Sequence, residues 1–354
     1  MQRPAPVSVP ISADLPYDVL FVGSSAVVDF DPIRYGRVPH PDAAKEAAAI
    51  HDTWAAAVAS RPATYNATKF RLAGVLATFP NRDSGGDDGV TAAAAATVTL
   101  QLGLTDYRTY VGTHLGSGDT PLASWGHPRH LALALGNAAV VVTSDGRVPL
   151  LRRSAAVVEG TGHYVVPGGH PEPSAVTSPE ADAGTFPADP AAASAAAASE
   201  LTASMAREVV EELYLPPDAV PLDCLVLLGG VARGGGCGRP QLCYTATLDM
   251  SSGAVEAAWA AGVARHKAIA AVAAGGRIPM STAAEAVEST ELVWLDEAEV
   301  GVVASTGETR GGKKLMPEHW GAVALYWGSR RGGDDRETKS CKMAGAAGGG
   351  DERE

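Results

Sequence analysis

The chain has 354 residues with a formal net charge of −12, and 46% of its residues are hydrophobic while 19% are charged. This length suits about two domains, each able to bury its own core, and the acidic balance argues against a nucleic-acid-binding surface, because such a surface needs clustered Lys and Arg. Prolines interrupt the early apolar residues and no apolar run reaches about 18 residues, so we expect no signal peptide, no membrane span and a cytoplasmic location, with an organelle transit peptide as the alternative.

The first part of the chain, residues 15–135, is predicted to form a mixed α+β lobe after a disordered N-terminus at 1–14. Its expected elements are a strand pair within 17–30, a helix at 43–59 and strands at 69–79 and 97–104, the last two joined by a loop rich in Gly and Asp.

The second part, residues 136–328, begins with a predicted β-hairpin, in which AAVVVT and RVPLLRRS flank a Ser-Asp-Gly turn. The stretch 174–199 has few bulky apolar residues, so we expect a surface insertion that does not order by itself. The other expected elements are strands at 155–158 and 163–166, a helix at 200–213, strands at 224–233 and 242–249, a helix at 255–272, a strand at 291–295, a helix near 320–327 and a disordered tail at 329–354. The four cysteines form no CxxC pair, which predicts reduced thiols.

A glycine pair interrupts the segment VVPGGHPEP, residues 165–173. Glycine reaches positive φ without a steric penalty, so Gly168 and Gly169 suit a tight turn. They equally suit a backbone that approaches a ligand closely, phosphate above all. The segment by itself leaves both interpretations open.

The predicted helix at 200–213 carries three glutamates within one turn. Glu208, Glu211 and Glu212 share one face, beside an apolar face, and Arg207 is expected to pair with Glu211 four residues later. Such carboxylates repel each other unless they are solvated or bind a divalent cation, and Mg²⁺ prefers oxygen ligands. A solvated face is the alternative, but the order of strand, glycine loop and acidic helix favours a cleft for a metal and a diphosphate.

This order of parts resembles the Nudix hydrolase signature. The segment VPGG is followed by an acidic loop and then by R-E-V-V-E-E, which keeps the pattern at Arg207, Glu208, Val209, Glu211, Glu212 and Leu215. The sequence departs from the pattern in three ways. Tyr214 stands where glycine is usual, the stretch 174–199 separates the glycines from the helix, and Glu200 lies one residue closer to Arg207.

Within that superfamily the chain resembles the branch of UDP-glucose and UDP-galactose diphosphatases, from about residue 54 to 327. The matching segments are VPGGHPEP, E-x6-[RQ]-E-x2-[ED]-E, TKFRLAG, LQLGLTDYRTYVGT and EST. The resemblance implies a Nudix α/β/α sandwich with an N-terminal mixed α+β lobe that supplies the base pocket. It also implies Mg²⁺-dependent hydrolysis of UDP-sugars to UMP and sugar 1-phosphate. The alternatives are a diphosphatase for another nucleotide, such as ADP-ribose or coenzyme A, and a catalytically silent nucleotide-binding Nudix module.

The same resemblance assigns roles to residues. Glu208, Glu211 and Glu212 become catalytic, and Glu208 and Glu212 become the metal ligands. Substrate contacts are expected at Tyr65, Tyr107, Arg153, Val158, Val165, His170, Glu172 and Glu318. Without the resemblance, the valines would be core residues and the tyrosines half-buried packing.

Three of these roles have a physical rationale. The rings of Tyr65 and Tyr107 suit the uracil, because an aromatic face stacks on any base. Arg153 suits the diphosphate, and strand alternation lets only one of Arg152 and Arg153 face the cleft. Glu288 is a candidate water-activating base or further ligand, since such a group must face the acidic helix from an opposite loop, with a plain loop carboxylate as the alternative.

Overall fold

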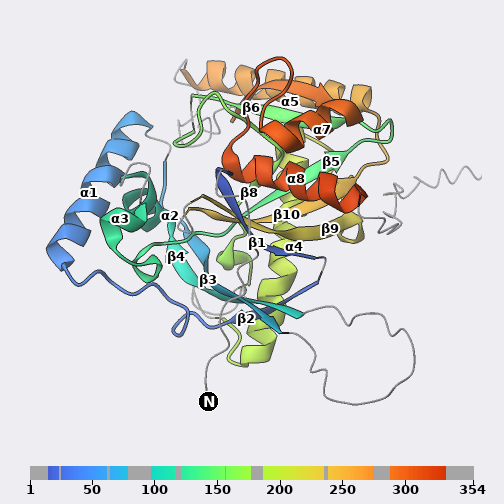
Figure 1. Ribbon diagram of the computed structural model, residues 1–354. Coiled ribbons are helices and arrows are strands. Elements are labelled where there is room, and N and C mark those ends of the chain that lie inside the picture. The colour runs from blue at the N-terminus through green and yellow to red at the C-terminus, as the bar shows by residue number, and fades with distance from the viewer. Residues whose placement is uncertain are drawn as a thin grey trace, which may run out of the picture.

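The computed structural model describes residues 15–23, 25–61, 64–78, 97–116, 121–155, 157–176, 186–234, 238–274 and 288–331 (Figure 1). The predicted disorder at 1–14 lies outside these residues, as does the tail after 331. Within the described part, no helix is long and apolar enough to cross a membrane.

A five-stranded sheet occupies the centre, with the strand order β1-β9-β10-β5-β8. Its strands are β1 (Tyr17–Val22), β9 (Leu225–Arg233), β10 (Pro240–Thr247), β5 (Gly136–Val142) and β8 (Gly168–Gly169). β5 and β10 are parallel, and the other neighbouring strands are antiparallel. β1 was predicted within the first lobe, but its pairing with β9 assigns it to this sheet.

Helices cover both faces of the central sheet. Along β5, Ala139 and Val141 join the core cluster that contains residues of α4 (Pro190–Leu213), whereas Ala138 and Val140 join the cluster that contains residues of α8 (Pro317–Arg331). This alternation follows from the two-residue period of a strand. Figure 1 shows α4 and α8 on opposite sides of the sheet, so the predicted α/β/α sandwich is confirmed.

A second sheet has the order β11-β6-β7, with β11 (Ser289–Leu295), β6 (Val148–Arg153) and β7 (Tyr164–Val165). The predicted hairpin of β5 and β6 is therefore wrong. The two strands are joined by a tight turn, in which the Thr143 N–H donates to the Arg147 carbonyl at 2.9 Å, but they belong to different sheets. The predicted strand at 155–158 is also wrong, because residues 157–159 form a bend.

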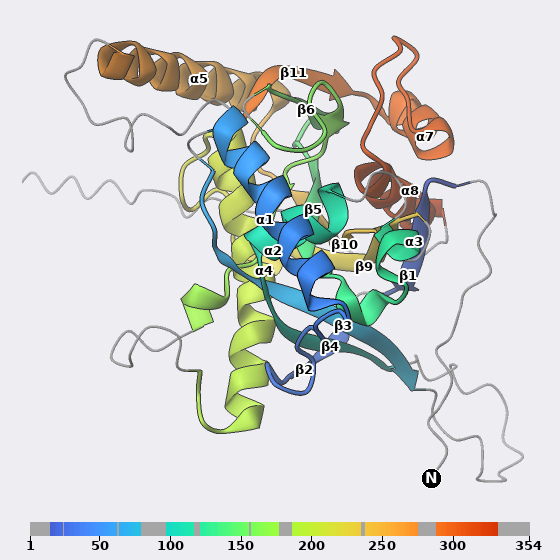
Figure 2. The ribbon, with the colours of Figure 1, turned by 90° about the vertical axis from the view of Figure 1, so that its left-hand side faces the viewer.

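The third sheet has the order β2-β4-β3, with β2 (Ala26–Phe30), β4 (Thr97–Asp106) and β3 (Thr68–Thr78). The helices that accompany it are α1 (Ala43–Ser60), α2 (Tyr107–Tyr110), which continues into a π-helical turn at Val111–Leu115, and α3 (Pro121–Trp125). Figure 2 shows α1 lying over α2. These elements form the first lobe, and the predicted helix and strands within 43–104 are confirmed.

Helix α4 is longer than predicted, because residues 190–199 are helical. Asp189 caps the first turn by accepting hydrogen bonds from the N–H groups of Ala191 and Ala192, and Pro190 takes the first helical position. The buried Ala193 lets this half lie close to β2, and the Phe30 N–H donates to Ser194 Oγ at 3.0 Å. The expectation that 174–199 lacks order was thus wrong for its last ten residues. That expectation rests on the need for bulky apolar side chains to order a segment. Alanine provides another route, because it has a high helix propensity and its small side chain allows close packing.

The end of α4 explains the tyrosine that stands where the Nudix pattern has glycine. Tyr214 adopts the left-handed conformation, with φ 53° and ψ 38°, which is the usual role of glycine at a helix C-terminus. Its ring lies on Gly262 of α5 (Ser252–Ala274), where a Cβ would collide with it, and its centroid is 5.2 Å from that of His266.

Two further elements end the chain that the structure describes. Helix α7 (Glu297–Thr306), capped by Asp296, was not predicted. α8 extends to Arg331, so the tail predicted to be disordered from residue 329 begins within a helix. Cys243 is free and buried, whereas Cys224 is disulfide-bonded, so the predicted reduced state is wrong for that thiol.

Candidate active site

The glycine pair forms β8 at the edge of the central sheet, against β5. Neither glycine has a positive φ, so the reason for glycine is space rather than backbone conformation. A Cβ on Gly168 would collide with the Asn137 carbonyl oxygen, and one on Gly169 would collide with the Glu208 carboxylate. The close approach is therefore made to the protein's own sheet and to the acidic helix.

The backbone of this loop holds two of the α4 carboxylates. The Gly168 N–H donates to Glu212 Oε2 at 3.0 Å, and the His170 N–H donates to Glu208 Oε1 at 3.2 Å. Between them, the Gly169 N–H donates to Asn137 Oδ1 at 3.0 Å. The loop and the helix thus orient each other, and both carboxylates face the glycines.

The Arg207 side chain pairs with Glu200, not with the predicted Glu211. Its guanidinium lies 2.5 Å from Glu200 Oε1, and the same oxygen accepts the Glu172 N–H at 3.0 Å. Glu200 is 5% exposed, so this ion pair ties the end of the glycine loop to α4 in a partly buried environment. Glu211 is exposed at the surface of the helix.

Ionisation of the two held carboxylates is unfavourable. Burial, with the charges of Glu211 and Glu288, raises the pKa of Glu208 to about 7. Burial, with the charges of Glu288 and Glu208, holds the pKa of Glu212 well above its usual value. Glu288 is exposed next to β6, where its carbonyl accepts the Ser154 N–H, and its charge contributes to raising the pKa of both carboxylates. A cation would relieve this repulsion.

Three cations lie near the glycine loop. Burial and the charges of Arg239, Lys69 and Arg153 hold the pKa of His170 well below its usual value, so its ring is neutral. Arg239 donates to the Gly169 carbonyl at 3.4 Å, and Lys69 Nζ lies 3.8 Å from Glu172 Oε1. The loop thus has both carboxylates and cations as neighbours, which suits a metal bound beside a diphosphate.

No protein-family model matches the chain. Among curated proteins it is similar to Nudix hydrolase 9 of Arabidopsis thaliana, at 40% identity over 158 residues, and this match covers 43% of the chain and about half (48%) of the plant protein. It is also similar to uridine diphosphate glucose pyrophosphatase NUDT22 of Bos taurus, at 29% identity over 299 residues that cover 82% of the chain and 88% of the bovine protein. The Mus musculus protein of the same name matches at 29% identity over 305 residues, 84% of each chain. Over most of its length the chain is thus similar to proteins named as Nudix hydrolases or UDP-glucose pyrophosphatases. The resemblance seen in the motifs is confirmed, and so is the prediction of an enzyme.

The first lobe reaches the candidate site through Tyr107. Its half-buried ring stacks on Tyr110, with centroids 6.0 Å apart, and meets His170 edge-on at 6.5 Å. Tyr65, predicted as the second base contact, is 70% exposed on the segment that leads into β3. The Ala67 carbonyl of that segment accepts the Tyr107 N–H at 2.9 Å, so the two tyrosines lie on adjoining backbone segments.

Three predicted substrate residues surround the loop in different ways. Arg153 is half-buried and its Nε donates to the Glu159 carbonyl at 2.9 Å, whereas Arg152 is exposed, which agrees with strand alternation. Val158 is half-buried in the bend beside Glu159, and the exposed Glu172 contacts Lys69.

Two predicted substrate contacts are buried. Val165 is 1% exposed in the core, and its backbone pairs with Leu151. Glu318 is 0% exposed and accepts two hydrogen bonds from Arg233, at 3.1 and 2.7 Å. Both were assigned by resemblance alone, and their role as substrate contacts stays a prediction.

Sequence reasoning missed Lys69 and Arg239. Lys69 stands in the segment TKFRLAG, where a lysine among apolar strand residues was the available signal. Arg239 follows a glycine-rich stretch and had no local signal, because its position beside Gly169 arises from the pairing of β10 with β5.

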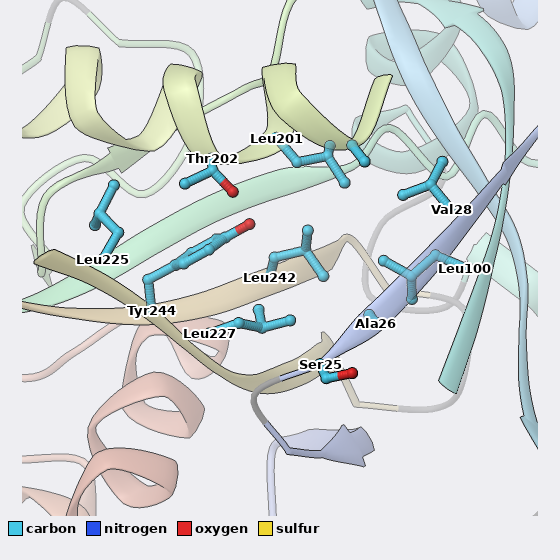
Figure 3. Close-up of a pocket in the computed structure, with 11 residues that line it drawn as sticks. Ser25, Ala26, Val28, Leu100, Leu201, Thr202, Leu225, Leu227, Leu242 and Tyr244 are labelled. Atoms are coloured by element: carbon cyan, nitrogen blue, oxygen red, sulfur yellow. The ribbon is translucent and has the colours of Figure 1, made fainter. Parts of the chain in front are cut away.

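A separate cavity of about 320 Å³ lies along the middle of α4, between β2, β4, β9 and β10 (Figure 3). Its lining is mostly apolar, with the hydroxyl groups of Thr202 and Tyr244 facing each other from α4 and β10. None of the site carboxylates or cations lines it, so this cavity is distinct from the candidate active site.

Proposed function

We propose that the protein hydrolyses the diphosphate of UDP-sugars, such as UDP-glucose and UDP-galactose, to UMP and sugar 1-phosphate with Mg²⁺ as cofactor. The observation that carries this proposal is the pair Glu208 and Glu212, held by N–H groups of the glycine loop, with cations near the same loop. The relatives named uridine diphosphate glucose pyrophosphatase support the substrate class, because their matches span both lobes.

Glu208 and Glu212 would hold the metal. Among the described residues, no three acidic, His or Cys side chains converge into a ready-made metal site. This arrangement fits Mg²⁺, which commonly uses one or two carboxylates together with substrate phosphates and water. When bound, the metal would act as a Lewis acid and lower the pKa of its water. The raised pKa values of both glutamates are the structural sign that the pocket favours a cation.

Other residues would orient the substrate and move the proton. The Arg153 guanidinium would bind the diphosphate, and the rings of Tyr107 and Tyr65 would contact the base. Glu288, whose charge already acts on both metal-binding glutamates, would accept the proton of the attacking water. The neutral His170 would donate or accept one hydrogen bond at the loop, since its Nε2 is buried without a partner among the described residues.

The test is hydrolysis of UDP-glucose by the purified protein, with UMP measured by chromatography in Mg²⁺ and in excess chelator. We expect release in Mg²⁺ only, and a loss of at least about 100-fold for Glu208→Gln and Glu212→Gln. Glu297→Gln, which changes an exposed glutamate on α7, serves as the matched control and should retain activity.

Release of UMP that ignores the chelator would contradict the metal, and no release from any UDP-sugar would contradict the substrate class. A panel with ADP-ribose and coenzyme A separates the latter case from a silent protein. Faster turnover of either compound would move the substrate assignment and keep the reaction.

A further inference from the structure

Lys69 is a buried cation whose ammonium group forms one long ion pair among the described residues. It is 8% exposed on β3, and its nearest ion-pair partner among the described residues is Glu172 Oε1 at 3.8 Å. That distance exceeds a hydrogen bond. An ammonium group has three donors and no acceptor, so a single remote carboxylate oxygen leaves its donors poorly used in a place where desolvation is unfavourable.

A second buried cation, two residues later on the same strand, has a structural role and serves as a comparison. Arg71 is 3% exposed and donates to the backbone carbonyls of Leu131, Tyr35, Pro128 and Arg129 at 3.1 to 3.5 Å. Its guanidinium is therefore satisfied by the lobe itself. Lys69 lies on the same face of β3 by strand alternation, yet among the residues that the structure describes no backbone carbonyl accepts a hydrogen bond from it.

The surroundings of Lys69 belong to the candidate active site. Burial lowers the pKa of Lys69, while the charges of Glu172 and Glu208 raise it and that of Arg239 lowers it further. Its neighbour Thr68 pairs with Asp106, the residue before Tyr107. The ammonium therefore stands where the first lobe meets the glycine loop, within electrostatic reach of Glu208, on a strand that pairs with the residue before Tyr107.

We propose that Lys69 binds a phosphate oxygen of the substrate diphosphate, and that Glu172 holds the ammonium until the substrate replaces it; this rests on the proposed function. An anionic phosphate oxygen supplies the close acceptor that Lys69 lacks, and lysine binds phosphate as a point charge. The first lobe thus contributes directly to diphosphate binding, in addition to the base contact.

The experiment compares the binding of uridine, UMP and UDP to the wild type and to Lys69→Met, by ligand-observed NMR in Mg²⁺ so that weak affinities are measurable. We expect the dissociation constant of UDP to rise about 10- to 100-fold, as for loss of a charged hydrogen bond, with that of uridine unchanged. Lys69→Arg should restore part of the UDP affinity. Lys267→Met, on an exposed part of α5, is the matched control.

Equal weakening of uridine and UDP would overturn the proposal in favour of a structural role, and so would unchanged UDP binding or a wild type that does not bind UDP. Lys69→Gln provides a second variant if the methionine variant unfolds. Because binding is measured without turnover, a wild type that binds UDP through Lys69 yet hydrolyses no UDP-sugar would overturn the proposed function alone.

Discussion

The protein buries carboxylates in two regions and compensates them in opposite ways. At α8, Glu318 accepts two hydrogen bonds from Arg233; burial opposes its charge, but the charge and hydrogen bonds of Arg233 outweigh this and lower its pKa. At α4, Glu208 is held by a neutral backbone N–H and lies near two other carboxylates, so burial and repulsion raise its pKa to about 7.

This difference distinguishes a carboxylate that stabilises the fold from one that is available to bind a ligand. A buried carboxylate with its own guanidinium is complete, and a ligand has nothing to add to it. Glu208 forms no ion pair among the described residues, and the charge of Lys69 does not outweigh burial and repulsion, so its environment favours either a proton or a metal. Burial by itself therefore does not identify a site, whereas burial without a counter-charge does.

The largest expected effect is a loss of stability at α8, where Glu318 has its own guanidinium partner. Arg233→Met leaves the fully buried Glu318 without its partner and also removes the ion pair between Arg233 and Glu159 at 2.5 Å. We expect a loss of about 3–5 kcal/mol in the free energy of unfolding, measured by urea denaturation. Arg34→Met, which removes an exposed pair with Asp29 at 4.0 Å, should change it by less than about 1 kcal/mol. Similar losses for both variants would contradict the idea that the buried Glu318 depends on its guanidinium partner.

The second prediction concerns the pH dependence of stability that Glu208 of α4 causes. Because the pKa of Glu208 is about 7 in the folded protein and near 4.5 when unperturbed, the folded state binds more protons between these values. Stability of the metal-free protein should therefore fall as pH rises from about 4.5 to 7, by on the order of 3 kcal/mol from this group. The measurement is the difference in unfolding free energy between Glu208→Gln and the wild type at pH 5 to 8, in chelator. A difference that does not grow with pH would refute the raised pKa, and added Mg²⁺ should reduce it.

The smallest effect sharpens the geometry of the site. Gly169→Ala places a methyl group against the Glu208 carboxylate and should displace it, which we expect to lower turnover about tenfold and stability by about 1–3 kcal/mol. Gly253→Ala, where a Cβ meets nothing within 4 Å, is the control and should be neutral. Full activity of the Gly169 variant would show that the close contact with Glu208 is not needed.

The sequence predicts a helix or a charged face where apolar or charged residues recur at a regular spacing. The carboxylates of α4 recur at helical spacing beside the buried Met205 and Val209, so both the helix and its acidic face were predictable. The first half of the same helix escaped prediction, because alanine carries neither bulk nor charge. α7 escaped for a similar reason, since its ten residues have only a weak apolar period.

The sequence did not predict which residues contact each other across long distances in the chain. The guanidinium of Arg207 could reach either of two glutamates, and the burial of Glu200 selected the pair. The alternation of β5 and β6 is compatible with one hairpin or with two sheets, and pairing of β5 with β10 and of β6 with β11 selected the latter. The same long-range pairing buried Val165 and Glu318 and brought Arg239 to the glycine loop.

The sequence by itself determined the α/β class, the acidic helix and the glycine pair, because helical spacing, strand alternation and the steric freedom of glycine are properties of a few neighbouring residues. The tertiary structure decided which carboxylates have a counter-charge and which lack one. That property depends on distances between residues far apart in the chain, such as Glu208 from Glu288 and Lys69 from Glu172, and only tertiary packing sets them.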